Sequence, residues 1–332
     1  METTRDWTGG TLPALGMGCW AIGGPFTFDG APVGWGDSDD DTSRATIAAA
    51  FEAGVRVFDT AQAYGTGHSE GLLGEVLAAR PEARIVTKVG LGIDADRRRI
   101  TGLQTDPAEI RAGLDQSRRR LGRDLIDLVL LHPNELTVAE AAPILDTLAD
   151  ERAKGRLAAF GWSTDFPDKV RANADRPGFA AVEFAANVFF AADRMRDGIA
   201  GLDLVRLIRS PLAMGLLGGR ITPQTQVRGA DVRTRETDYN DWFTGGRMSP
   251  HYARRLEAVR ELLTTGGRTL AQGALSWLWA RHPGCLPVPG MRTPAHVADL
   301  AGALAHGPLD PGTMAGIERL IDRPPEGAPR PR

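Results

Sequence analysis

Four ionisable side chains of complementary chemistry follow short apolar segments of the chain: Asp59, Tyr64, Lys88 and His132. Asp59, Lys88 and His132 are each the last residue of such a segment, and Tyr64 lies shortly after Asp59. A carboxylate, an ammonium, a phenol and an imidazole that meet in one place can deliver a proton to a carbonyl oxygen. No side chain supplies a hydride, so the reduction of a carbonyl at such a site would also need a cofactor.

The phenol is the expected proton donor of this set. An unperturbed tyrosine has a pKa of about 10, which is too high for easy proton exchange near neutrality. A nearby ammonium stabilises the phenolate and lowers that pKa. We therefore expect Lys88 to lower the pKa of Tyr64, with Asp59 holding Lys88 protonated and in place. His132 can donate a hydrogen bond to the substrate oxygen.

These residues need a scaffold that brings the ends of separate strands together. Short β-rich segments alternate with longer helical patterns along the chain, which predicts βα units and a parallel sheet. Eight is the strand number of an α/β barrel, in which the carboxyl ends of the strands surround one mouth. The eight expected strands lie near residues 15–19, 55–58, 85–88, 125–132, 158–163, 181–185, 204–210 and 286–289.

The fold class is therefore α/β, a single (β/α)8 TIM barrel over residues 1–322 with long loops at its carboxyl-terminal face. The chain has 332 residues, and barrels of this length commonly form one domain. The Pro-rich residues 323–332 are expected to form a disordered tail. Residues 22–41 and 218–249 break the alternation, and both follow strands, so both are expected at the mouth.

Composition narrows the classes of partner. A net charge of −3 provides no basic field for nucleic acid, and two cysteines provide neither a disulfide framework nor metal-ligand spacing. No apolar segment approaches the length of a membrane span, and the amino terminus lacks the apolar centre of a signal peptide. We expect a cytoplasmic protein that binds a small molecule and no metal.

Aromatic residues on the expected loops could form an apolar substrate pocket. Asn134, which follows His132-Pro133, could add a polar contact. The aromatic candidates for substrate binding are Trp20, Phe26, Trp35 and Phe189.

One motif suggests a different fold. Residues 16–21 match the GxGxxG/A fingerprint of dinucleotide-binding Rossmann domains, and acidic residues follow at roughly the expected distance. The fingerprint requires a helix to open at its third position, so that pyrophosphate meets the helix amino terminus. The next residues are Ile22-Gly23-Gly24-Pro25, which favour a loop, so we do not adopt this interpretation.

Residues 54–74 form a long and specific motif that resembles the signature of the aldo-keto reductase family. The resemblance continues through residues 86–88, 130–132, 161–163, 210–217 and 288–294, in the family's order. It implies a TIM barrel that uses NADPH without a Rossmann domain. In the family, the counterpart of Tyr64 is the general acid in reduction and the base in oxidation.

The resemblance also implies a cofactor site with several departures from the family's pattern. Thr164 stands where the family has Asn, and Glu183 where it usually has Gln. A carboxylate accepts hydrogen bonds but cannot donate them. Arg292, at an expected helix start, favours NADP through the 2′-phosphate. The implied cofactor residues are Ser163, Thr164, Glu183, Arg209, Ser210, Leu212, Gly218, Arg220, Gly290, Arg292 and His296.

The main functional prediction is an NADPH-dependent reductase of aldehydes or ketones, acting reversibly through Tyr64 on a small carbonyl substrate. Two alternatives stay open. In the first, the chain is a non-catalytic nicotinamide-binding module, since the fold of the resembling family also serves that purpose. A biosynthetic enzyme that reduces an imine or oxidises a hydroxyl would account for charged residues such as Glu183 and Arg209 near the nicotinamide.

Overall fold

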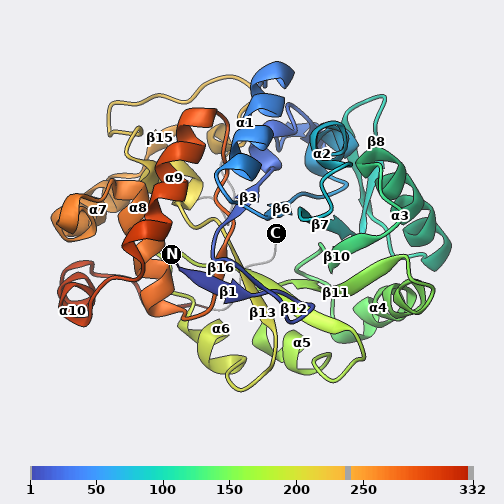
Figure 1. Ribbon diagram of the computed structural model, residues 1–332. Helices are drawn as coiled ribbons and strands as arrows, with labels where there is room; N and C mark the ends of the chain where they lie inside the picture. The colour runs from blue at the N-terminus through green and yellow to red at the C-terminus, as the bar shows by residue number, and fades with distance from the viewer. Residues whose placement is uncertain (1, 236–240, 328–332) are drawn as a thin grey trace.

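Eight parallel strands curl into a nearly closed barrel in the computed structural model, which describes residues 2–235 and 241–327 (Figure 1). In the sheet the strands follow chain order, and the first and last meet where Gly18 N donates to Pro289 O at 2.9 Å. Each of the eight segments expected from the sequence forms one strand, so the barrel prediction is confirmed. The strands are β3 (Gly16–Gly18), β6 (Val57–Asp59), β7 (Arg84–Val89), β10 (Ile126–Leu131), β11 (Leu157–Ser163), β12 (Phe179–Ala185), β13 (Val205–Arg209) and β16 (Leu286–Pro287).

Helices form a ring outside the strands (Figure 1). Local signals set their ends: Asp106 accepts hydrogen bonds from the backbone N–H groups of Ala108 and Glu109 at the start of α3, and Gly122 closes that helix with a φ of 64°. The α-helices of the described residues are α1 (Asp40–Glu52), α2 (His68–Leu77), α3 (Pro107–Leu121), α4 (Val138–Ala153), α5 (Pro167–Arg171), α6 (Asp193–Gly198), α7 (Pro250–Leu263), α8 (Leu270–Arg281), α9 (Pro294–His306) and α10 (Pro311–Leu320).

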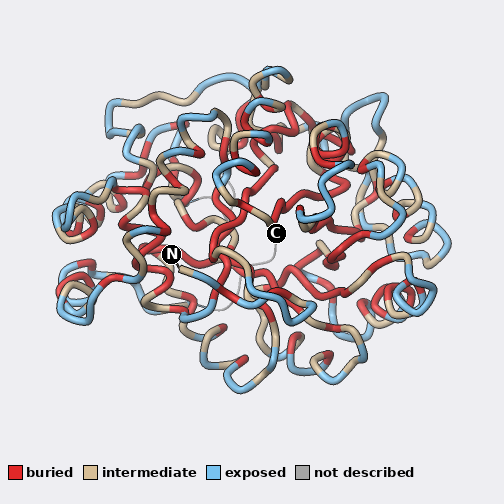
Figure 2. Tube along the Cα trace, viewed as in Figure 1, coloured by how far each residue is buried: buried red, intermediate tan, exposed pale blue. Residues whose placement is uncertain are grey.

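The core has two layers. Val57, Val86, Leu130 and Leu207 belong to an apolar cluster built from alternate residues of the strands, which fills the barrel. The intervening strand residues join a larger cluster with the inner faces of the helices. Figure 2 shows the result, with buried strands at the centre and helices exposed on their outer faces. This alternation assigns each strand residue either to the barrel interior or to the helix layer.

Short extra elements cover the two ends of the barrel. At the amino-terminal end lies the hairpin of β1 (Thr3–Arg5) and β2 (Thr11–Pro13), whose Leu12 packs on the interior cluster. A four-stranded sheet combines two hairpins, with β9 paired to both β4 and β8. Its strands are β4 (Thr27–Phe28), β5 (Ala31–Pro32), β8 (Leu91–Asp94) and β9 (Arg99–Leu103). The remaining elements are η1 (Trp20–Ile22), η2 (Tyr64–Gly67), η3 (Ala213–Gly218), η4 (Val232–Thr234), β14 (Phe243–Thr244), β15 (Arg247–Met248) and η5 (Thr265–Gly267).

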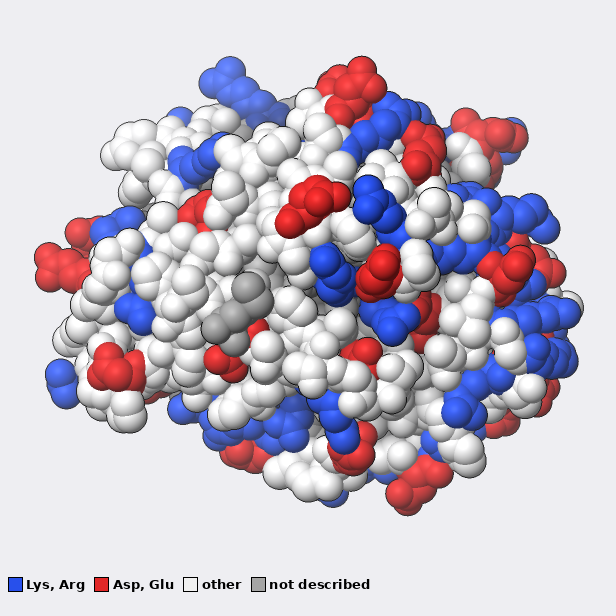
Figure 3. Space-filling model, in the orientation of Figure 1, with Lys and Arg blue, Asp and Glu red and all other residues white. Residues whose placement is uncertain are grey.

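Charges of both signs are spread over the surface (Figure 3), and hydrogen bonds hold the last described residues of the chain. Acidic and basic side chains are interspersed on the face drawn in Figure 3. Among the described residues, no helix is both long and apolar enough to cross a bilayer. Residues 328–332 of the expected disordered tail lie outside the described residues. Arg323 and Glu326, just before them, make hydrogen bonds to Val188 and Arg194, and the disordered tail stays a prediction.

Candidate active site

Strand alternation places the ionisable residues at the carboxyl-terminal mouth of the barrel. Asp59 and Lys88 each stand two positions after a valine of the interior cluster, Val57 and Val86. Because side chains two apart on a strand point to the same side, both project into the barrel above its apolar filling. The same spacing from an interior residue holds for His132, Glu183 and Arg209.

Lys88 is the centre of the polar cluster. Its Nζ donates to Asp59 Oδ1 at 2.5 Å, to the Thr60 carbonyl oxygen at 3.1 Å and to the Tyr64 hydroxyl at 3.4 Å. These three contacts use all three hydrogens of the ammonium. Lys88 is only 1% exposed, so the geometry is held by packing as well as by charge.

Tyr64 is positioned by a tight turn under the loop that follows β3. The turn, η2, contains Gly65 with a φ of 60°, and a Cβ added at that glycine would lie 1.9 Å from the carbonyl oxygen of Gly23. Only glycine permits this approach. Trp20 stacks beside the Tyr64 ring with centroids 6.0 Å apart, and His132 packs edge-on at 5.8 Å.

Glu183 brings a second carboxylate to the same ammonium. It is 1% exposed on β12, and its Oε2 lies 3.5 Å from Lys88 Nζ. This is an ion-pair distance, but Oε2 accepts no hydrogen bond from any residue that the structure describes. Because Lys88 has already committed its three hydrogens, the Glu183 oxygen is left as a buried acceptor without a donor.

Burial dominates the proton affinities of the cluster. It raises the pKa of Tyr64; Lys88 opposes the rise, and the carboxylates of Asp59 and Glu183 add to it. The expectation of a lowered pKa for Tyr64 was therefore wrong for the protein alone, because one ammonium does not outweigh burial and two nearby carboxylates. The structure keeps Tyr64 a protonated hydrogen-bond donor at neutral pH.

The pKa values of the neighbouring groups shift for the same reasons. Burial, and then Glu183, raises the pKa of Asp59 to about 7, although Lys88 acts in the opposite direction. Burial alone would lower the pKa of Lys88, but Asp59 and Glu183 together raise it, so the amine stays charged. Burial and the nearby cations Lys88 and Arg209 lower the pKa of His132 to about 3, so its imidazole is neutral.

A pocket of about 430 Å³ opens over this cluster. Asp59, Tyr64 and His132 line it. Of the predicted substrate residues, Trp20, Phe26, Trp35 and Asn134 also line it. Phe189 does not, because its ring is buried against Tyr252 of α7 at a centroid distance of 5.2 Å. A second hollow of about 560 Å³ lies at the amino-terminal end of the barrel and contains none of the four ionisable candidates.

Some lining residues were missed from the sequence. Leu91, Ile100 and Leu103 belong to the hairpin of β8 and β9, which forms one wall, and Arg233 and Trp242 belong to the long segment after η3. The sequence held a signal for this hairpin: Leu91 and Ile93 stand two positions apart before the turn at residues 95–98, and Ile100 follows it in a second short segment.

Arg209 is engaged by an acid that the sequence analysis did not consider. It donates to Asp165, which also accepts from the Ala185 N–H at 2.9 Å. Asn134 accepts from the Asp165 N–H at 2.9 Å and so fixes the same loop. The positive charge of Arg209 at the pocket is therefore paired, which leaves less of it available for a ligand.

The predicted cofactor residues divide into two groups. Glu183, Arg209, Ser210, Leu212, Gly290, Arg292 and His296 line the pocket. The others do not line it: Gly218 and Arg220 lie at and just after the end of η3, and Ser163 and Thr164 are buried at the end of β11 and directly after it.

A nicotinamide cofactor fits the polar atoms of this site. Ser163 Oγ and Glu183 Oε2 are buried without hydrogen-bond partners in the described part of the chain, and their residues pair in register on β11 and β12. A carboxamide offers the donors and the acceptor that these atoms lack. At the other end, Arg292 and His296 stand at the start of α9, where a phosphate is favoured. Arg292 donates to the carbonyl oxygen of Asp37 at 2.7 Å.

Comparison with known proteins adds an independent line of evidence. A model of the aldo/keto reductase family matches residues 14–322. The NADH-specific methylglyoxal reductase of Escherichia coli (strain K12) is 28% identical over 313 residues, which cover 89% of this chain and 90% of that protein. The glycerol dehydrogenase AKR11B4 from Gluconobacter oxydans is 26% identical with a TM-score of 0.79, over 98% of both chains. An aldo-keto reductase from Klebsiella pneumoniae in complex with NADPH shares the fold, with a TM-score of 0.69 at 21% identity over 98% of this chain and 96% of that chain.

Proposed function

The chain belongs to the aldo/keto reductase family, and from this premise we propose that it reduces an aldehyde or a ketone, with Tyr64 as the proton donor. The observation that carries the proposal is the contact of 3.4 Å between Lys88 Nζ and the Tyr64 hydroxyl at the floor of the pocket. It couples a phenol to a buried ammonium at the place where a carbonyl oxygen would bind. Family membership by itself supports the coarser statement, an oxidoreductase that acts on carbonyls.

The residues have complementary parts in this reaction. The raised pKa keeps the proton on Tyr64 until the carbonyl oxygen gains negative charge, and the phenol then gives it up. The ammonium of Lys88 stabilises the phenolate that is left, and Asp59 holds Lys88 in position. His132 is a neutral imidazole beside Tyr64, so it can direct the carbonyl oxygen with a hydrogen bond without carrying charge.

When bound, a nicotinamide cofactor supplies the hydride that no side chain can provide. Its carboxamide would be held by Ser163, Thr164 and Glu183. Its phosphate, at the adenosine end, would be held by Arg292 and His296. We propose NADPH as the preferred form, because Arg292 places a cation at the amino terminus of α9. The Escherichia coli relative is named as NADH-specific, so the preference needs a direct comparison.

The test measures binding and turnover separately. Thermal-shift titrations with NADPH, NADP⁺, NADH and NAD⁺ establish the cofactor, and the oxidation of that cofactor is then followed with a panel of aldehydes, ketones and imines. Stabilisation by NADPH and turnover of a carbonyl are expected. Binding without turnover of any substrate would favour a non-catalytic module, and turnover of imines alone would favour the biosynthetic alternative.

Tyr64→Phe is the decisive variant. It removes one oxygen and the transferable proton while the ring can keep its packing on Trp20 and His132. The turnover number should fall by at least about 100-fold, the usual range for general acid catalysis, while the Kd for the cofactor changes little. Unchanged turnover in this variant would refute the assigned proton donor.

A further inference from the structure

Glu183 is a buried carboxylate that the proton-transfer steps do not use. It lies within 3.5 Å of the ammonium on which Tyr64 depends, it lines the pocket, and its Oε2 has no hydrogen-bond donor among the described residues. A glutamine would occupy the same space with an amide that donates as well as accepts. What the carboxylate adds to the site is negative charge.

The charges around Lys88 do not balance. Asp59 and Glu183 bring two carboxylates to a single ammonium. The other ionisable groups at this position do not correct the excess, because His132 is neutral and Arg209 is paired with Asp165. The raised pKa of Asp59 is a sign of the same excess, since a proton taken up there relieves it. A cation that entered the pocket would relieve it too.

The reacting part of the cofactor must enter this pocket. Hydride has to reach the carbon of the same carbonyl whose oxygen receives the proton of Tyr64. Glu183 is close to that point, because Glu183 and the phenol of Tyr64 both contact Lys88. The nicotinamide ring is neutral in its reduced form and positively charged in its oxidised form. An excess of negative charge in a buried site therefore distinguishes the two forms by charge alone.

We propose that Glu183 makes the site selective for the oxidation state of the nicotinamide, stabilising the oxidised cofactor over the reduced one. This inference rests on the proposed function, because it requires that a nicotinamide binds here. Binding and reaction are thermodynamically linked. If Glu183 raises the affinity for the oxidised cofactor relative to the reduced cofactor by some factor, the equilibrium constant for hydride transfer to the substrate on the protein rises by the same factor. Glu183 would thus bias the bound equilibrium toward reduction of the carbonyl.

The test compares dissociation constants and needs no turnover. The Kd values of NADP⁺ and NADPH are measured by titration calorimetry at one pH and one ionic strength, for the natural protein and for Glu183→Gln. Gln keeps a hydrogen bond to the carboxamide but loses the charge, so the ratio of Kd for NADP⁺ to Kd for NADPH should rise by at least about tenfold. If Glu183 only holds the carboxamide, both constants change by one common factor and the ratio stays constant, which would overturn the proposal.

Two further variants keep the test specific. Glu183→Asp retains the charge, so its ratio should stay close to that of the natural protein even if both affinities fall. Glu151→Gln removes another fully buried carboxylate, which pairs with Lys154 and Arg156 at α4, and the ratio should again stay constant. A ratio that moves equally in Glu151→Gln would overturn the proposal, and failure of the natural protein to bind any nicotinamide would overturn the proposed function with it.

Discussion

At the residue scale, burial is the force that sets the chemistry of the ionisable side chains. The pKa of Tyr64 rises, and that of His132 falls to about 3, in each case because the charged form is the one that burial disfavours. Lys88 is the exception, because two carboxylates outweigh its desolvation. One protonated phenol, one charged amine and one neutral imidazole are the states that the proposed proton transfer from Tyr64 uses.

Burial has the same effect on His282, which lies away from the pocket. It is fully buried, its Nε2 donates to the Ala191 carbonyl oxygen at 2.8 Å, and burial lowers its pKa from 6.5 to about 4. The unfolded chain therefore takes up the proton first as the pH falls. The stability that depends on the neutral imidazole is complete above pH 6.5 and is lost progressively between pH 6.5 and 4.

We expect acid to destabilise the natural protein more than a His282→Gln variant, in which an amide can donate the same hydrogen bond. Between pH 7 and pH 5 the natural protein should lose about 2 kcal/mol of unfolding free energy relative to the variant. Urea denaturation of both proteins at the two pH values measures this difference. Parallel losses in the two proteins would contradict a neutral buried imidazole.

At the scale of elements, a small sheet outside the barrel decides the shape of the pocket. The hairpin of β8 and β9 extends from the end of β7, and β9 pairs with β4 of the loop that follows β3. Ile100 stands opposite Phe28 in that pairing, and both side chains line the pocket. This sheet and the indole of Trp20 form an apolar wall above the polar side chains of Asp59, Tyr64 and His132. Such a wall favours the binding of a ligand with an apolar body.

Replacing Ile100 with Asn should weaken the binding of an aromatic aldehyde without changing the chemistry. A polar side chain loses about 1–2 kcal/mol of apolar contact, so KM should rise about tenfold while kcat stays within about twofold. Steady-state kinetics with an aromatic aldehyde and with a short aliphatic aldehyde measure this effect. Ile93→Asn is the matched control, because Ile93 pairs with Ile100 in the hairpin but does not line the pocket. Equal effects of the two variants would show a general loss of the hairpin.

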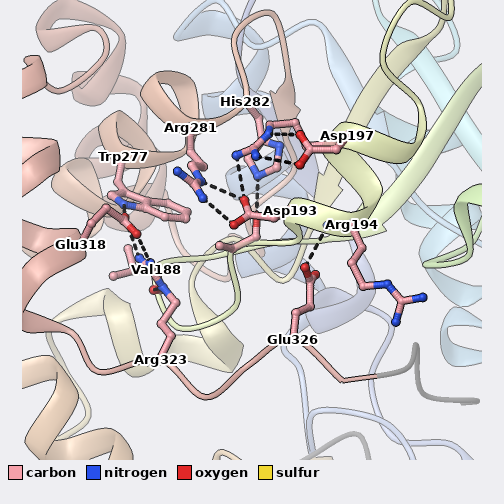
Figure 4. A network of polar contacts seen from close by, with 12 residues as sticks. Val188, Asp193, Arg194, Asp197, Trp277, Arg281, His282, Glu318, Arg323 and Glu326 are labelled. Carbon is pink, nitrogen blue, oxygen red and sulfur yellow. Dashed lines mark hydrogen bonds and ion pairs between the residues drawn. The ribbon is translucent and has the colours of Figure 1, made fainter.

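At the scale of the whole molecule, contacts between distant parts of the chain close the barrel and fix its last segment. The closing strand β16 has only two residues, and Gly18 lets β3 approach it, since a Cβ there would lie 2.6 Å from the Val288 carbonyl oxygen. Beyond α10 the chain is tied back to Val188, which follows β12, and to Arg194 of α6, as the close view shows (Figure 4). Arg323 pairs with Glu318, donates to the Val188 carbonyl oxygen at 2.7 Å and lies over the ring of Trp277.

Arg323→Gln should destabilise the fold, because the guanidinium is largely buried and its carboxylate partner would lose two charge-assisted hydrogen bonds. We expect a loss of about 1–3 kcal/mol in urea denaturation monitored by circular dichroism. Arg319→Gln, an exposed position on α10, is the control and should change stability by less than about 0.5 kcal/mol. Equal stability of the two variants would contradict the role of Arg323 as an anchor.

The sequence by itself determined the barrel and the identity of its polar floor. Three of the strand segments are apolar and carry an ionisable residue at or next to their carboxyl ends. Parallel strands must bring such ends to one mouth, so Asp59, Lys88 and His132 could be grouped before any coordinates. Local patterns carry this information because alternation along a strand is a property of neighbouring residues.

Only the tertiary structure decided the proton affinities, the charge balance and the walls of the pocket. Lys88 acts to lower the pKa of Tyr64, but the net direction of the shift depends on the depth of burial and on the nearby carboxylates, of which Glu183 is far away in the sequence. Likewise, the pairing of Arg209 with Asp165 and the withdrawal of Phe189 into the core depend on packing between elements. Electrostatic energies vary with the distances and the dielectric around each group, and these exist only once the chain has folded.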